Sequence, residues 1–146
     1  MRSPDFVIGP FESPYMLRWY MIPRNRWFGI YWHRFLRHDD DRALHDHPWW
    51  SFSIVLRGGY FEITRAHDGT EERKWYGPGS IKLRSAKYSH RIELAERSDG
   101  SLVHCETLFF MGPRVREWGF LCPQGWVHWR QFVSPGDHGN VGKGCE

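Results

Sequence analysis

Turn-forming residues interrupt this chain so often that only short secondary-structure elements fit between them. The sequence has 15 glycines and 9 prolines spread over 146 residues. The segments between them are rich in Trp, Tyr and Phe, which make up 17% of the chain. Bulky aromatic side chains between frequent turns favour short strands over long helices. The pattern therefore predicts an all-β protein and argues against an α/β fold.

The expected strands recur about every ten residues along the chain. They comprise residues 15–22, 27–36, 51–56, 60–64, 72–76, 80–84, 90–94, 102–111, 117–121 and 126–132. We expect Gly58-Gly59 to close a hairpin between two of them. The only segment whose sequence favours a helix is residues 39–44, and it is too short to form a stable helix alone. Many evenly spaced strands without intervening helices predict an antiparallel sandwich or barrel.

Length and composition suit one domain over residues 1–146, with an N-terminal arm at 1–12 and a loose tail at 134–146. We expect no membrane span, because no run of 18 apolar residues occurs. We also expect no secretory signal, because the first ten residues lack an apolar core. The three cysteines are odd in number and form no Cys-x-x-Cys. This predicts reduced thiols rather than a disulfide, in agreement with a cytoplasmic chain.

The sharpest chemical feature is the sequence His45-Asp46-His47-Pro48. Histidines two residues apart in an extended segment point to the same face. Both imidazoles then reach one metal ion at about 2.1 Å. Pro48 supports this interpretation because it restricts His47 to extended conformations. A His-x-His pair alone is a weak indication, since the chain contains nine histidines.

The surroundings of this pair resemble both motifs of the cupin family. The first motif has His-x-His, three or four residues, a Glu, six residues and a Gly. Here Ser51 occupies the Glu position and Gly58 the Gly position. The second motif reaches its His eleven residues after its first Gly, as Gly79 and His90 do. The similarity runs from Asp39 to Leu94 and is greatest to small uncharacterised cupins of bacteria and phages. Residues 19–35 and 112–120 also resemble the corresponding segments of these proteins.

The resemblance implies a double-stranded β-helix (jelly-roll) barrel with a metal held inside one end by His45, His47 and His90. Ser51 departs from the family's Glu ligand and leaves three imidazoles with open metal positions, which is typical of a catalytic site. Such a site suits Fe, which we favour, or Zn, Ni, Mn or Cu. The alternative is a degenerate cupin that lost its metal together with the Glu. The chain departs from the family pattern at further positions. Asp39 replaces the opening Gly, and Ser85 and Lys87 replace the internal Pro and Gly of the second motif. Leu94 replaces the closing Asn.

Further residues are candidates for the pocket or for support of the ligands. Each also has a simpler interpretation: a core side chain for His33 and the tryptophans, and a surface position for Glu106 and the arginines. Strand alternation predicts that Asp46 points away from the metal and that Ser51 shares the face of the two ligands. The set comprises Ser51, His33, Glu106, Trp49, Trp50, Arg114, Arg116 and Trp118.

The leading functional hypothesis is a small-molecule metalloenzyme, most specifically an iron-dependent oxygenase such as a dioxygenase. A second is a non-catalytic cupin that binds a small ligand or serves as an accessory protein. A third is metal-assisted isomerisation of a sugar or keto acid, for which His33 or Glu106 would have to be the base. The family resemblance also implies a homodimer. The net charge of only +3, without a basic stripe, argues against a nucleic-acid partner.

Overall fold

The computed structural model describes residues 1–39, 43–133 and 142–146, and within them the chain forms three antiparallel sheets. The strands follow the evenly spaced strand-like segments of the sequence, so the all-β prediction is confirmed. The elements are β1(Phe6–Ile8), β2(Met16–Tyr20), β3(Gly29–Phe35), β4(Leu44–His45), β5(Ser51–Arg57), β6(Tyr60–Arg65), β7(Glu71–Tyr76), β8(Ile81–Arg84), β9(Arg91–Leu94), β10(Cys105–Met111), β11(Gly119–Cys122), β12(Gly125–His128) and α1(Trp129–Phe132).

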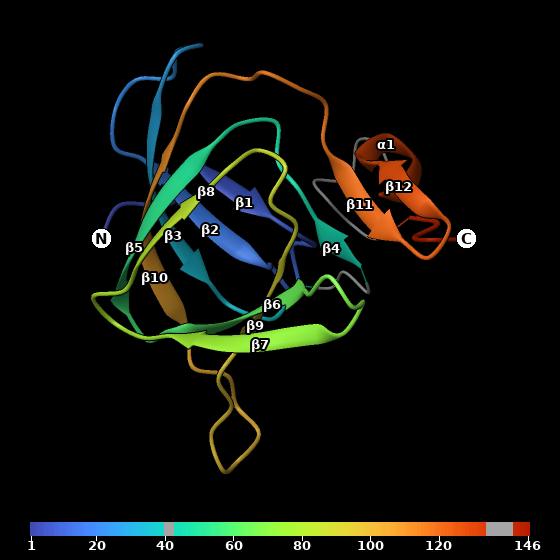
Figure 1. Cartoon of the computed structure of the whole chain (residues 1–146). Coiled ribbons are helices and arrows are strands. Elements are labelled where there is room, and N and C mark those ends of the chain that lie inside the picture. The colour runs from blue at the N-terminus through green and yellow to red at the C-terminus, as the bar shows by residue number, and fades with distance from the viewer. Residues whose placement is uncertain (40–42, 134–141) are drawn as a thin grey trace.

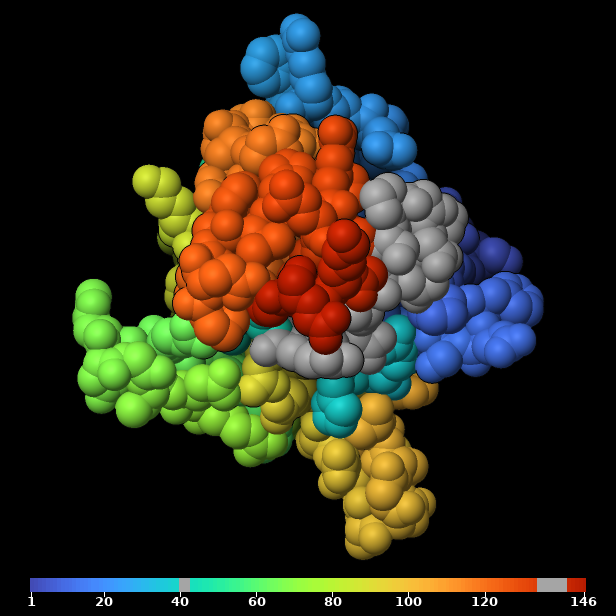
Figure 2. All heavy atoms as spheres, turned by 90° about the vertical axis from the view of Figure 1, so that its right-hand side faces the viewer, coloured from blue at the N-terminus to red at the C-terminus, as the bar shows by residue number. Residues whose placement is uncertain are grey.

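The three sheets surround a common interior (Figure 1). The largest has the order β1-β2-β3-β10-β5-β8, and the smaller two have the orders β7-β6-β9 and β12-β11-β4. In Figure 1 the large sheet lies on the left, β7-β6-β9 closes the bottom, and β4-β11-β12 with α1 lies on the right. Figure 2 views that right-hand end, where β11, β12 and α1 (orange to red) occupy the centre of the face. His45, the first metal-site candidate, is the last residue of β4 and so belongs to the sheet at this end of the barrel.

Alternation along the strands fills this interior. In β3 every second residue is buried, from Gly29 through Tyr31 and His33 to Phe35, as the period of two requires for one inward face. The main core cluster combines side chains of the large sheet with side chains of β6 and β9. It consists of Met16, Phe35, Val55, Tyr60, Ile92, Leu94 and Cys105. Burial of this shared apolar surface holds two of the sheets together.

The expected hairpin at Gly58-Gly59 is wrong. β5 pairs with β10 and β8, whereas β6 pairs with β7 and β9, so the chain changes sheets between them. The two glycines have φ of +74° and +143°, a region that L side chains rarely adopt. A Cβ at Gly58 would also collide with the carbonyl oxygen of His104. The glycines thus allow a sheet-to-sheet corner, which resembles a hairpin turn in sequence alone.

The ends of the chain differ in part from expectation. Residues 126–132, expected as one strand, form β12 and then the single helical turn α1. Within the arm at 1–12, β1 pairs with β2. Of the tail, residues 134–141 lie outside the described residues, and the amides of Gly142 and Gly144 both donate to the carbonyl oxygen of Phe132. Of the segment 39–44, residues 40–42 are likewise not described, and Leu44 begins β4.

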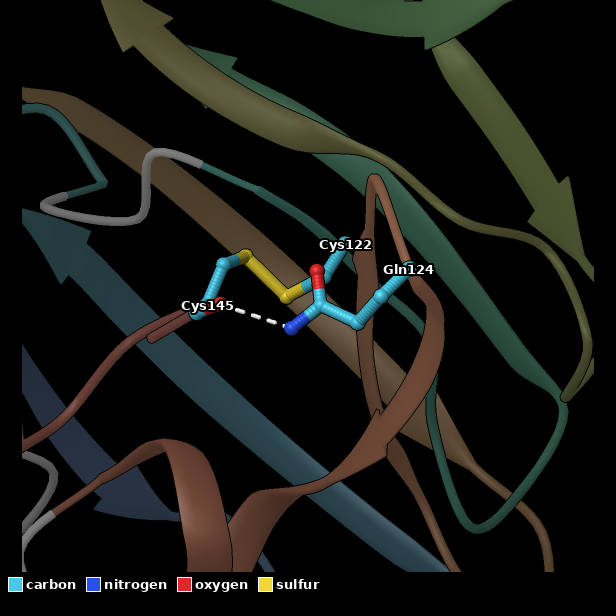
Figure 3. The surroundings of a disulfide bond; sticks show 3 residues. All are labelled: Cys122, Gln124 and Cys145. Carbon is cyan, nitrogen blue, oxygen red and sulfur yellow. Dashed lines mark hydrogen bonds between the residues drawn. A yellow bond between two sulfur atoms is a disulfide. The ribbon is translucent and has the colours of Figure 1, made fainter.

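The prediction of reduced thiols is wrong for two of the three cysteines. Cys122 in β11 and Cys145 form a disulfide across 23 residues, with their Cα atoms 5.5 Å apart. Figure 3 shows this bond beside Gln124, whose side-chain amide donates to the carbonyl oxygen of Cys145 at 2.6 Å. Counting cysteines cannot reveal such a pairing, because it depends on the tail returning to β11. The disulfide also removes the thiol argument for a cytoplasmic chain. Among the described residues, no helix is long and apolar enough to cross a membrane.

We predict that Gly58→Ala destabilises the protein far more than Gly69→Ala. Both positions have positive φ, so each substitution introduces backbone strain of about 1–2 kcal/mol. Only Gly58 also faces a backbone atom, whereas space around Gly69 is open. We expect urea unfolding to show a loss of more than about 3 kcal/mol for Gly58→Ala. Equal losses in the two variants would contradict the corner geometry.

The disulfide predicts a specific count of reactive thiols. Cys105 is buried with 0% exposure, and burial raises its thiol pKa to about 12. Without reductant, a thiol reagent should therefore find none in the native protein and one after unfolding, then three after reduction. Reduction should lower the free energy of unfolding by about 3 kcal/mol for a loop of this length. Three reactive thiols in unreduced, unfolded protein would contradict the pairing.

Candidate metal centre

Three histidines converge at one end of the barrel interior. The potential ligand atoms of His45, His47 and His90 all lie within 4.8 Å of one another, and their ring centroids are 4.9–5.1 Å apart. Backbone pairing produces this arrangement: His45 and His90 exchange two N–H···O hydrogen bonds, of 2.9 and 3.0 Å. The amide of His47 donates to the carbonyl oxygen of Ala86 at 3.1 Å. Two segments 45 residues apart therefore meet with their imidazoles on the same side.

Asp46, between the two histidines, points away from them as strand alternation requires. Its carboxylate accepts from the amide of Gly119 at 2.8 Å and from the indole of Trp126 at 3.0 Å. Arg116, a candidate from the sequence, lies 2.8 Å from the same carboxylate and donates to the carbonyl oxygen of His47. Asp46 and Arg116 thus fix the backbone that presents the histidines rather than line the site.

Glu62 of β6 holds the third histidine, and sequence reasoning did not identify it. Its Oε1 lies 2.7 Å from His90 Nδ1, and its side chain is 2% exposed. The carboxylate also accepts from Arg84 Nε at 2.8 Å, so it is ionised and His90 must donate its Nδ1–H. This leaves His90 Nε2 with a free lone pair for a metal. Histidine ligands typically donate their other ring N–H to a carboxylate in this way.

The charge of Glu62 is balanced inside the protein. Arg84 of β8 donates to Glu62, to Ser53 Oγ at 3.0 Å and to the hydroxyl of Tyr60 at 2.7 Å. Burial on its own raises a carboxyl pKa, but the hydrogen bond from His90 and the charge of Arg84 outweigh it and hold the pKa of Glu62 at about 2. The only sequence signal was an acidic residue within an otherwise apolar strand, which does not reveal its partners.

His47 and His90 are in the neutral form that metal ligation needs. Burial lowers the pKa of His90 to about 3, even though the hydrogen bond to Glu62 opposes the shift. Burial, followed by the neighbouring His45 and His90, lowers the pKa of His47 well below its usual value. The buried Nδ1 of His47 has no hydrogen-bond partner among the described residues. Converging, deprotonated imidazole nitrogens are the donor set of a transition-metal site.

A cavity of about 320 Å³ opens in front of the histidines. Four candidates from the sequence line it: Ser51, His33, Trp49 and Trp118. Trp49 stacks on His47 with 5.1 Å between ring centroids. Most of the remaining wall is apolar or aromatic. Ser51 is 1% exposed, and its short hydroxyl adds no carboxylate to the ligand set.

The other candidates lie away from the cluster. Glu106 is on the opposite face of β10 from the cavity residues Thr107 and Phe109, and it pairs with Arg34 at 2.7 Å. Arg114 pairs with the exposed Glu117 at 2.9 Å. Trp50 is 41% exposed and packs against Gly112. Glu106 therefore does not support a ligand, which was the functional alternative that the sequence left open for it.

No protein-family model matches the chain, and no curated protein matches its sequence. Among solved structures, Fe(II) HppE is similar at 13% identity with a TM-score of 0.55, over 76% of this chain and 59% of that one. HppE with the alternative substrate (S)-1-HPP gives 14% and 0.53, over 77% and 58%. A Klebsiella pneumoniae protein with a double-stranded β-helix domain gives 12% and 0.54, over 82% and 95%.

These likenesses establish the fold. The chain has the double-stranded β-helix fold of the cupins, as the resemblance at residues 39–94 implied. It spans less than two thirds of the HppE chain. The likenesses to solved structures concern the fold, whereas the geometry of the histidine triad and of its Glu62 partner is observed in this chain itself.

Proposed function

We propose that this cupin-fold protein binds one divalent transition-metal ion through His45, His47 and His90 and is a small-molecule metalloenzyme of the iron-dependent oxygenase kind. The observation that supports this most strongly is the convergence of three imidazoles within 4.8 Å, with His90 fixed by an ionised carboxylate. A structural metal site would have four protein ligands. Ser51 replaces the fourth with a hydroxyl, so ligand positions stay open toward the cavity.

Iron is the favoured metal, with zinc, nickel, manganese and copper as alternatives that the donor set also suits. Fe(II) in the structurally similar HppE supports iron. When bound, such an ion supplies Lewis-acid and redox chemistry for a substrate and dioxygen.

The chain's own residues would prepare that chemistry. Glu62 keeps His90 in one tautomer and orientation by accepting its Nδ1–H. Asp46 and the His45–His90 backbone bonds hold the imidazoles at fixed positions. The aromatic wall, with Trp49, Phe109 and Phe120, excludes water from the face where a substrate would bind. The site thus combines rigid ligands with a dry, open side.

The other two hypotheses differ in how they fit. An isomerase needs a base beside the metal, but Glu106 lies on the other face of the sheet. His33 Nε2 already accepts a hydrogen bond from Arg18 at 2.9 Å, and burial lowers the pKa of His33 well below its usual value. Neither is a free base, so isomerisation is the weaker alternative. A non-catalytic ligand-binding cupin would have the same cavity, so an experiment must distinguish it from the oxygenase.

We predict that tag-free protein loaded with Fe(II), or Zn(II), retains about one metal ion per chain. His45→Ala and His90→Ala should lose most of it, because each removes one of three ligands. Glu62→Gln should weaken metal affinity about 10- to 100-fold. The neutral amide no longer balances the charge of Arg84, and it no longer increases the basicity of the His90 imidazole as a ligand. Metal content is measured by elemental analysis after equilibrium dialysis.

Matched controls are His67→Ala and Glu72→Gln, which change exposed residues and should leave the metal content unchanged. Ser51→Ala should also keep metal affinity within roughly threefold, whereas Ser51→Glu should tighten it by adding an anionic ligand. Wild-type protein that retains no metal after reconstitution would overturn the proposal.

The oxygenase assignment predicts an open coordination position on the iron. Nitric oxide added to anaerobic, Fe(II)-loaded protein should therefore give a paramagnetic nitrosyl signal, absent in the His90→Ala variant. A Zn(II)-loaded sample serves as the blank. If Fe(II) binds but no nitrosyl forms, the metal site stands and the oxygenase assignment falls in favour of a binding protein.

A further inference from the structure

Three polar side chains form a row across the inner face of the large sheet. Arg18 of β2 lies opposite His33 of β3, and His33 lies opposite Thr107 of β10. Directly opposed residues in antiparallel strands share a face, with Cβ atoms about 5 Å apart. All three line the cavity in front of the histidine triad. The site already described makes no use of this row.

Arg18 is a half-buried cation that has no carboxylate partner among the described residues. Its Nε donates to His33 Nε2 at 2.9 Å, and its guanidinium lies 4.7 Å from the centre of the Tyr31 ring. Among the described residues, no acid lies within ion-pair distance of it. By contrast, the buried Arg84 pairs with Glu62. An accepting Nε2 means that His33 is neutral, so His33 fixes one end of the Arg18 fork without cancelling its charge.

The hydroxyl of Thr107 is a second group with unused hydrogen-bonding capacity. The residue is 2% exposed, and its Oγ1 has no hydrogen-bond partner among the described residues. A buried polar group without a partner is uncommon, because it has lost its bonds to water. A ligand beside His33 would have a guanidinium on one side and a hydroxyl on the other.

Other charged side chains of the cavity wall have hydrogen-bond partners of their own. Arg37 donates to the carbonyl oxygen of Ser13 at 3.0 Å. Asp39, the acid in the cavity wall, accepts from the amide of Ile92 at 2.6 Å and lies 4.0 Å from His45. It is therefore at the histidine end of the cavity. The Arg18 end is left positive.

A continuous aromatic path joins Arg18 to the metal ligands. The ring of His33 lies 5.0 Å from Phe109, Phe109 lies 5.6 Å from Trp49, and Trp49 lies 5.1 Å from His47. A molecule bound at Arg18 would place its apolar body against these rings and its far end before the triad. Guanidinium groups recognise carboxylates and phosphates through two parallel hydrogen bonds.

We infer that the cavity binds a small organic anion, with its carboxylate or phosphate-like group on Arg18 and Thr107 and its apolar body along Phe109 and Trp49. Arg18 is thus a specificity residue for charge. The anion site itself stands on the chain's own residues, and only the approach of the ligand's far end to a metal rests on the proposed function.

Isothermal titration of metal-free protein with benzoate, phenylphosphonate and neutral benzamide tests the inference. We expect at least one of the anions to bind at least tenfold more tightly than benzamide, because hydrogen bonds to charged groups contribute about 10- to 100-fold in affinity. The benzoate and phenylphosphonate arms distinguish a planar from a tetrahedral head group. Arg18→Met should abolish the preference, and Thr107→Val should reduce it severalfold. Arg65→Met, which changes an exposed arginine, should leave it intact.

Anions that bind no better than benzamide to wild-type protein, or not at all, would overturn the inference, and this comparison needs no variant. An anion preference that survives in folded Arg18→Met would overturn it as well. Metal content is measured on the same preparations after reconstitution with Fe(II). Anion binding in protein that cannot hold a metal would leave the anion site standing and overturn the metalloenzyme proposal alone.

Discussion

The buried carboxylate of Glu62 joins the parts of the barrel that must stay in register for the site to exist. It lies on β6, accepts from Arg84 on β8 and holds His90 at the start of β9. Arg84 in turn bonds Ser53 of β5 and Tyr60 of β6. One ionic network therefore connects the large sheet, the β7-β6-β9 sheet and the histidine triad. Breaking it would leave a buried charge unpaired, which is strongly destabilising.

This network also separates two electrostatic environments within one cavity. Near the triad, Glu62 pairs with Arg84, and burial lowers the pKa of His90 to about 3, so this imidazole remains uncharged and available as a ligand. At the opposite wall, the neutral His33 is the hydrogen-bond partner that the described residues offer Arg18. The aromatic rings between them keep the cavity apolar, where electrostatic interactions are strengthened. An anion at one end and a metal at the other would complement this division.

The C-terminal part of the chain supports the site from outside. Asp46 binds the backbone of Gly119 in β11 and the indole of Trp126 in β12, so the small sheet fixes the segment that contains His45 and His47. Figures 1 and 2 show this sheet and α1 at the same end of the barrel as β4. The disulfide between Cys122 and Cys145 links the end of the chain to β11. A cross-link there restrains the support rather than the ligands themselves.

The sequence by itself determined the all-β class, most strand positions, the cupin resemblance and the three histidines, because these depend on local periodicity and on fixed spacing. Tertiary structure alone decided which sheet each strand joins, the partner of Cys122, the position of Glu106 and the importance of Glu62, Arg84 and Arg18. The physical reason is that strand alternation assigns a face only within one unbroken strand. A corner such as the one at Gly58 resets it. Pairing between distant buried charges depends on geometry, which no local pattern encodes.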